Sequence, residues 1–259
     1  MIPTTITQPA GGGNSGRVAS AIQLAAARTG VDFSYLFSQA RIESGLNPNA
    51  RARTSSATGL FQFIDQTWLG TVKRHGAAHG LGWAADAIQR TPSGRYHVAD
   101  PAARRAILDL RRQPEAASAM AAEFASDNQQ YLEGRLGRPV ESVDLYLAHF
   151  LGPAGAARFL RAHDSNPNAS AAGILPSAAR ANRWVFFNRD GTPRSFAQIR
   201  ERFADRIGGG SGPLPSRQPS IEPTSVRMAA LETDLGREMV RPTPEHARLA
   251  YLMLAQLGG

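Results

Sequence analysis

The chain has 259 residues, of which 42% are apolar, and this length is enough for one sizeable hydrophobic core and a shorter tail. It has no cysteine, which excludes disulfides and thiolate metal sites, and no apolar run approaches the roughly 20 residues that a membrane span requires. The formal net charge is +8, but no helix-turn-helix, zinc-finger or aromatic RNA-binding signature accompanies it, so we predict no nucleic-acid partner.

The chain begins with a predicted leader and a predicted helix. Residues 1–15 are glycine-rich and are predicted to be a flexible leader. Residues 17–28 are predicted to form a helix ended by Gly30, because their apolar residues recur at helical spacing. The amino terminus has neither a basic start nor an apolar segment, so we expect no secretory signal.

The next predicted helix, residues 33–44, carries a glutamate in its last turn. Leu36, Ala40 and Glu43 share one helical face, and Gly45 follows at the position of a left-handed cap. Burial and the negative end of the helix dipole both disfavour a charged carboxylate there, so we interpret Glu43 as a proton donor. The alternative is a solvated glutamate at a helix end.

A loop rich in glycine, serine, asparagine and proline follows, and it is predicted to form a cleft wall. At its end, Gln62 is the only polar residue within the apolar run 60–64, where we also expect a minor hairpin (59–64). A buried amide needs hydrogen-bonding partners, and a sugar N-acetyl group would supply them. The alternative is a structural amide bonded to the protein backbone.

These two stretches carry a family resemblance. Residues 43–50 (Glu-Ser-Gly-Leu-Asn-Pro-Asn-Ala) and 55–63 (Ser-Ser-Ala-Thr-Gly-Leu-Phe-Gln-Phe) closely resemble the first two motifs of soluble lytic transglycosylases, glycoside hydrolase family 23. The resemblance implies an all-α fold, that is, the mostly helical α+β lysozyme-like domain. It assigns to Glu43 the role of sole catalytic acid and base, and it places Gln62 in the sugar cleft. The substrate-binding residues expected beside them are Ser44, Ser56 and Phe63.

Helices are also predicted in the middle of the chain. Asp65 and Asp100 are candidate N-caps, and the segment 80–99 between their helices reads as irregular. The histidines in this part lack paired ligand spacing, so we predict no metal site. The predicted helices here are residues 65–75, 101–112 and 114–136, the last ended by Gly137.

The third motif of the family is Ala-Tyr-Asn-Ala-Gly, and residues 148–152 resemble it incompletely. Histidine stands at position 149 in place of tyrosine, and phenylalanine follows in place of asparagine. His149 is interpreted either as a core or rim imidazole or as a polar group that reaches the sugar or Glu43. Tyr146 precedes His149 by three residues on the same predicted helix face and is a second candidate for the tyrosine. The predicted cap of this helix is Ser142.

The last helix of the predicted catalytic domain, residues 16–207, begins at a capping box of Ser195 and Gln198. Residues 208–224 are rich in glycine and proline and are predicted to be a linker. Residues 225–259 hold two amphipathic segments too short to be stable alone. We expect this tail to dock on the enzyme or on an assembly partner.

The function implied by the resemblance is that of a peptidoglycan lytic transglycosylase, which cleaves the β-1,4 bond between N-acetylmuramic acid and N-acetylglucosamine without water. The products would be 1,6-anhydromuropeptides, and no cofactor is expected. A second carboxylate across the cleft, from Asp65, Asp86 or Asp100, would suit a hydrolytic muramidase instead. The rival hypothesis is a non-catalytic peptidoglycan-binding or scaffold protein of a flagellar, secretion or virion assembly. The expected location is the periplasm or cell wall, reached by specialised export or virion delivery.

Overall fold

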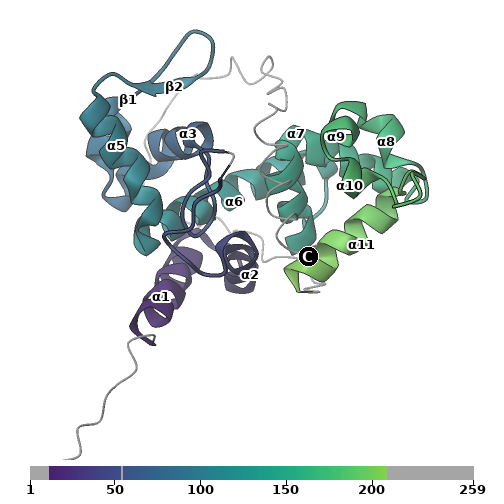
Figure 1. The fold of residues 1–259 in the computed structure, drawn as a ribbon, viewed down its shortest axis with the longest axis horizontal. Coiled ribbons are helices and arrows are strands. Elements are labelled where there is room, and N and C mark those ends of the chain that lie inside the picture. Colours follow the sequence, from purple (N-terminus) through teal and green to yellow (C-terminus); the bar gives the residue numbers. More distant parts are fainter. Residues whose placement is uncertain (1–11, 54, 209–259) are drawn as a thin grey trace, which may run out of the picture. The chain divides into compact units, whose positions relative to one another are not determined.

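The computed structural model describes residues 12–53 and 55–208, which form helices and one short β-hairpin (Figure 1). This confirms the predicted mostly helical fold class. Most of the predicted leader and the whole tail 225–259 lie outside the described residues, as does the predicted linker after Gly208. The elements, in chain order, are α1 Gly12–Thr29, α2 Phe33–Ser44, α3 Asp65–His75, η1 Gly76–His79, α4 Gly82–Ala87, β1 Ile88–Arg90, β2 Tyr96–Val98, α5 Pro101–Asp109, η2 Leu110–Arg112, α6 Pro114–Leu136, α7 Ser142–Ser165, α8 Ala171–Ile174, α9 Pro176–Ala181, α10 Arg183–Phe186 and α11 Phe196–Ile207.

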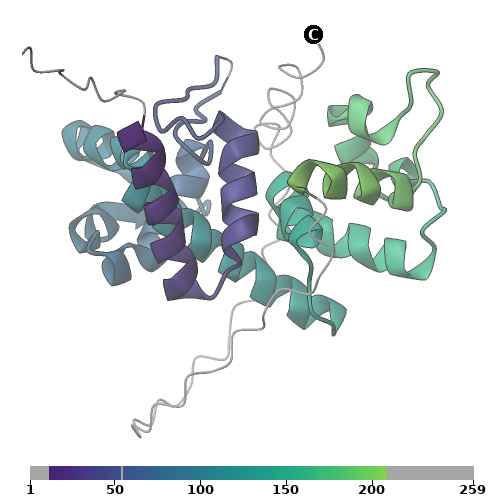
Figure 2. The same ribbon diagram turned by 90° about the horizontal axis from the view of Figure 1, so that it is seen from below.

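The described residues divide into two compact units within the predicted domain 16–207. The first contains residues 12–127 together with 206–208, and the second contains residues 128–205. In the first unit α1 and α2 pack side by side (Figures 1 and 2). Helix α1 begins at Gly12, five residues before its predicted start.

None of the helices in the described part of the chain has the length and apolar character of a membrane span.

The core of the first unit surrounds a fully buried tryptophan. The indole Nε1 of Trp68 donates a hydrogen bond to the carbonyl of Ile107 at 2.7 Å, so the polar atom of this large apolar side chain is satisfied. Trp68 therefore joins α3 to α5 through one buried contact. Other fully buried residues of this unit are Ile22, Leu36, Leu60, Phe61, Leu69, Ile88, Ile107 and Met120.

The regular hairpin is not where the sequence predicted it. Residues 59–64 contribute only the isolated bridge between Thr58 and Phe63, whereas β1 and β2 pair antiparallel with Ile88 opposite Val98. This sheet lies in the segment predicted to be irregular. The prediction was wrong because each strand has three residues, too few to show alternation.

The start of α5 and both ends of α6 lie at predicted signals, whereas α5 ends at Asp109, before the predicted end at residue 112. The side chain of Asp100 accepts hydrogen bonds from the backbone of α5 at 3.0 and 3.1 Å, which confirms the N-cap. Helix α6 spans the predicted residues Pro114–Leu136 and is followed by Gly137 with φ of 68°. Asp65, in contrast, does not cap α3, because it is the first helical residue and Ile64 occupies the cap position.

Imidazole and carboxylate groups connect the end of α3 and η1 to α6. His75 Nε2 lies 2.9 Å from Asp127 Oδ2, and His79 Nε2 lies 2.8 Å from Glu123 Oε1. These pairs explain why the two histidines, which are unremarkable in sequence, occupy fixed positions. In the described ranges, no group of three or more histidine, aspartate or glutamate side chains is arranged to hold a metal ion.

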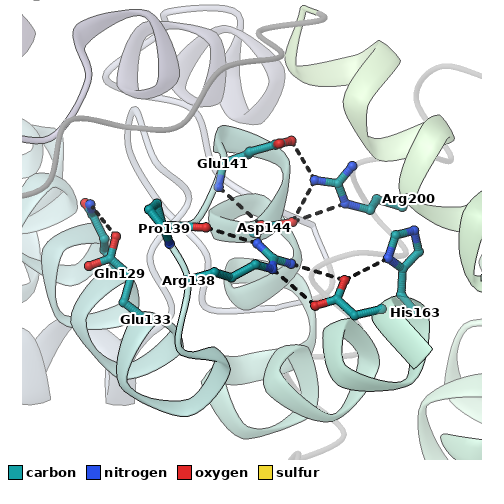
Figure 3. Close-up of polar contacts among 9 residues, drawn as sticks. Gln129, Glu133, Arg138, Pro139, Glu141, Asp144, His163 and Arg200 are labelled. Atoms are coloured by element: carbon teal, nitrogen blue, oxygen red, sulfur yellow. Dashed lines mark hydrogen bonds and ion pairs between the residues drawn. The ribbon is translucent and has the colours of Figure 1, made fainter.

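The second unit is organised by a buried carboxylate near the start of α7 (Figure 3). Asp144 is 0% exposed and accepts hydrogen bonds from Arg138 at 3.0 Å and from Arg200 at 3.0 and 3.2 Å. It also accepts the backbone N–H of Glu141 at 3.2 Å, which makes Glu141, not the predicted Ser142, the N-cap. A buried charge with two cationic partners is compensated, so this cluster joins α7 to α11 and to the segment before α7.

The remaining helices of this unit follow local signals. Helix α7 is kinked at Gly152, which has a φ of 72° and precedes Pro153. The capping box before α11 is confirmed, because Ser195 and Gln198 exchange backbone to side-chain hydrogen bonds of 3.0 and 3.2 Å.

The ion pair between Arg138 and Asp164 predicts a pH-dependent contribution to stability. Partial burial raises the pKa of the Asp164 carboxyl, but the hydrogen bonds from Arg138 and His163 together have a larger effect and lower it. The pKa therefore lies below its ordinary value. The stabilisation is therefore fully present above the unfolded-state pKa of about 3.9 and is lost as the pH falls through the lower folded value. Thermal unfolding of Asp164→Asn should show a decrease in Tm of at most about 3 °C near pH 6, because the pair is partly exposed.

The same difference in Tm should shrink as the pH is lowered toward 2, because the wild-type carboxyl then takes up its proton in the folded state as well. The matched control is Glu201→Gln, which neutralises an exposed carboxylate of α11 and should leave Tm unchanged at both pH values. A difference between wild type and Asp164→Asn that persists at low pH would contradict the assigned cause.

Candidate active site

Glu43 lies in the last turn of α2, as predicted, and is 8% exposed. The helix begins at Asp32, whose side chain accepts the N–H of Tyr35 at 2.8 Å, and it ends at Gly45 in the left-handed region with φ of 61°. Two caps thus define this helix, and the C-cap fixes where Glu43 stands relative to the loop that follows.

Ser44 connects the end of α2 to the second motif. Its Oγ lies 2.9 Å from the carbonyl oxygen of Leu60 and 3.0 Å from that of Ala40. The hydroxyl donor is therefore engaged by the backbone, and it holds the glutamate-bearing turn against residues 59–62. The structure places the predicted substrate-binding residue Ser44 in a tie between the two motifs.

The side chain of Gln62 is bonded within its own loop. Its Nε2 donates to the carbonyl oxygens of Gly59 at 2.8 Å and Ala50 at 3.2 Å, and the residue is 7% exposed. Gln62 also has a φ of 47°, which is unusual for a residue other than glycine. Of the two alternatives left open by the sequence, the amide bonded to backbone describes its nitrogen. Both bonds use the amide nitrogen, and the amide oxygen can accept a further hydrogen bond.

Gly59 is the point at which this loop touches η2. Its φ is +84°, and a Cβ atom built on it would overlap the carbonyl oxygen of Arg111 and lie 2.8 Å from the carbonyl carbon. Both features exclude a side chain, because the neighbouring atoms belong to the backbone. Glycine is therefore required at position 59 of the second motif both by its positive φ and by the close approach of the Arg111 backbone.

The side chain of Arg111 crosses the base of the same loop. It is 7% exposed, and its Nη1 lies 2.9 Å from the carbonyl oxygens of Ser56 and Phe63 and from Asp65 Oδ1, while Nε donates to Leu108 at 2.8 Å. Burial lowers the pKa of the guanidinium, although Asp65 beside it opposes the effect. Arginine nevertheless stays charged in proteins, so a buried cation holds the two ends of the segment 56–63 together.

The other predicted residues of this loop are structural in their visible contacts. The Oγ of Ser56 accepts the N–H of Asp65 at 3.2 Å. The ring of Phe63 is buried and packs edge to face on Trp68 and Phe124, with centroids 5.3 and 6.1 Å away. Phe63 thus belongs to the core under the loop.

Tyr146 and His149 lie on α7 in the second unit. Tyr146 is 3% exposed, and its ring is parallel to the half-buried imidazole of His149 with centroids 6.1 Å apart. Phe203 contacts Tyr146 edge to face at 5.6 Å. The predicted sharing of one helix face by Tyr146 and His149 is confirmed, and the less buried imidazole is the more accessible of the two.

The candidates for a second catalytic carboxylate have distinct surroundings. Asp65 is bound by Arg104 at 2.7 Å and by Arg111 at 2.9 Å, and Asp100 caps α5. Asp86 is exposed on α4. The partners of Asp65 and Asp100 explain these two residues without a catalytic role.

Arg111 was not singled out by the sequence. It belongs to a basic pair at the end of the predicted helix 101–112, a position typical of a solvated side chain, and its hydrogen bond to Phe63 spans 48 residues. No sequence signal distinguishes it, because Arg51, Arg53, Arg104 and Arg105 offer the same charge to Asp65.

A mostly helical domain that buries a glutamate at the end of a helix, beside a loop closed by glycine and glutamine, defines a protein of the lysozyme-like class. Residues 20–148 match the family model described as the transglycosylase SLT domain. The chain belongs to this family through that domain, as the sequence motifs predicted. The domain is of the lytic transglycosylase type and acts on peptidoglycan, an extracytoplasmic polymer.

The contact at Gly59 yields a stability prediction. Gly59→Ala should lower the free energy of unfolding by about 2–4 kcal/mol, because the new methyl group combines an unfavourable φ with overlap of a backbone carbonyl. Urea unfolding followed by circular dichroism measures the change. The matched control is Gly191→Ala, since Gly191 has a φ of +85° and nothing within 4 Å of a built Cβ. Equal losses for the two variants would show that the contact with Arg111 contributes nothing.

Proposed function

We propose that the protein is a peptidoglycan lytic transglycosylase in which Glu43 is the sole general acid and base. The observation that carries the proposal is the position of Glu43: a buried carboxyl at the C-terminal end of α2, joined through Ser44 to the second motif within an SLT domain. A carboxyl held at this position can donate a proton to a glycosidic oxygen that lies within hydrogen-bonding reach.

In the proposed reaction Glu43 donates its proton to the glycosidic oxygen as the bond from C1 of N-acetylmuramic acid to that oxygen breaks. N-acetylglucosamine leaves with a free 4-hydroxyl group. The carboxylate of Glu43 then takes the proton of the muramic C6 hydroxyl as its oxygen bonds to C1. Glu43 ends protonated, no water is consumed, and the ring closure benefits from the high effective concentration of an intramolecular nucleophile.

Substrate-binding roles are proposed for Gln62 and His149 on the basis of their contacts. Because the Gln62 nitrogen is bound to Gly59 and Ala50, its amide oxygen is the proposed acceptor for the N–H of a sugar N-acetyl group. The imidazole of His149, held parallel to the Tyr146 ring, is proposed to contact the sugar in place of the family tyrosine. These are binding roles, with no proton transfer assigned to them.

Substitution of Glu43 tests the proposal. Glu43→Gln should lower the rate of sacculus lysis at least about 100-fold, because it deletes the proton donor at nearly constant volume. The matched control, Asp86→Asn, neutralises an exposed carboxylate of the same unit and should keep the wild-type rate. Lysis by Glu43→Gln at the wild-type rate would refute the catalytic role, and loss of lysis by Asp86→Asn would indicate a second acid.

The products give an independent test. Digestion of sacculi in isotopically labelled water should release 1,6-anhydromuropeptides without the label, because the nucleophile is the substrate's own hydroxyl. Mass spectrometry of the sugar termini measures both the anhydro form and the label. Labelled, reducing-end muramic acid as the main product would make the protein a hydrolytic muramidase.

A further inference from the structure

The loop between Glu43 and Asp65 has an unusual charge composition. Its only charged residues are Arg51 and Arg53, and both are exposed. No acidic residue within the loop balances them. Such a pair of cations is the kind of feature that attracts an anionic ligand.

The backbone at Arg51 is fixed by the loop. Arg51 forms a bridge with Thr58, the N–H of Ala52 donates to Ala57 at 3.0 Å, and the N–H of Gly59 donates to Ala50 at 2.8 Å. A side chain on a fixed backbone loses less freedom on binding than one on a mobile segment.

The two arginines are on the loop that carries the proposed site. The carbonyl immediately before Arg51, that of Ala50, accepts the Nε2 of Gln62 at 3.2 Å. Ser44, the residue after Glu43, bonds to Leu60 on the other side of the same loop. The cations are therefore attached to the framework that positions Gln62 and Glu43.

Asp65, the acidic residue that follows this loop, already forms ion pairs with other arginines. Asp65 is bound by Arg104 and Arg111 at 2.7 and 2.9 Å, and within the described ranges no ion pair involves Arg51 or Arg53. Their guanidinium groups therefore keep their donors for a group outside the protein.

We propose that Arg51 and Arg53 bind free carboxylates of the peptide stems that peptidoglycan carries on its muramic acid residues. The inference rests on the proposed function, since it concerns the substrate of the same site. A guanidinium group pairs with a carboxylate through two parallel hydrogen bonds, and stem carboxylates are attached to the sugar whose bond is cleaved. Because both arginines are exposed, the contribution is modest and weakens with added salt.

The test measures binding apart from catalysis. Full-length protein carrying Glu43→Gln is sedimented with sacculi freed of phosphate polymers by hydrofluoric acid, and with the same glycan after an amidase has removed its stems. Adding Arg51→Gln and Arg53→Gln should weaken binding to stem-bearing glycan about three- to tenfold and leave binding to stripped glycan unchanged. The matched control is Arg95→Gln with Arg105→Gln, two exposed arginines of the same unit, which should change neither.

Two further arms make the result specific. Arg51→Lys with Arg53→Lys should bind stem-bearing glycan more tightly than the glutamine variants but less tightly than the parent, because lysine keeps the charge but lacks the bidentate geometry. Circular dichroism of each variant confirms that the fold is kept. Equal weakening on both glycans, or none on stem-bearing glycan, would overturn the proposal. Weakening seen only on sacculi that keep their phosphate polymers would also overturn it and assign the arginines to phosphate.

Failure of this inference is distinguishable from failure of the proposed function. If the wild type releases no 1,6-anhydro products while the arginines still govern binding to stems, the catalytic proposal fails and the stem contact stands. If the wild type releases 1,6-anhydro products and the arginine variants bind both glycans as tightly as Glu43→Gln alone, only the stem contact fails.

Discussion

The contact between the Arg111 side chain and the second motif is the constraint on which the candidate site depends. Residues 50–63 contain almost no regular secondary structure, so their conformation cannot come from a helical or strand ladder. One buried guanidinium instead binds the carbonyls of Ser56 and Phe63, and the backbone of Gly59 lies against the carbonyl of Arg111. Asp65 compensates the buried charge, without which its desolvation would be costly. Ser44 attaches the turn that carries Glu43 to this loop.

The parts that could be predicted are those whose signals are local. The place of Glu43 follows from helical periodicity and from Gly45, and the bounds of α6 follow from proline and glycine at its two ends. Arg111 could not be predicted, because its partners are fixed only when distant segments fold together. The misassigned hairpin has a similar cause, since three-residue strands carry no period, and Asp65 resembled a helix cap while its carboxylate is engaged by arginines.

The contacts of the expected substrate-binding residues distinguish those that support the loop from those proposed to contact the sugar. Ser44 and Ser56 bond to backbone, and Phe63 lies in the core, so each supports the shape of the loop. Gln62 combines a bonded nitrogen with an oxygen proposed for the sugar. His149 belongs to the second unit and to the part of the family pattern that this chain has altered.

The left-handed backbone of Gln62 has a consequence for how its substitution can be interpreted. Any side chain other than glycine is strained at a φ of 47°, and the two bonds from the amide to Ala50 and Gly59 offset that strain. Alanine at this position would keep the strain and lose the compensation, so a kinetic defect would combine a displaced loop with a lost sugar contact. Asparagine tolerates the conformation better but is one methylene shorter. The proposed sugar contact of Gln62 is therefore coupled to backbone geometry, and a substitution that changes this contact would need a second change that restores the turn.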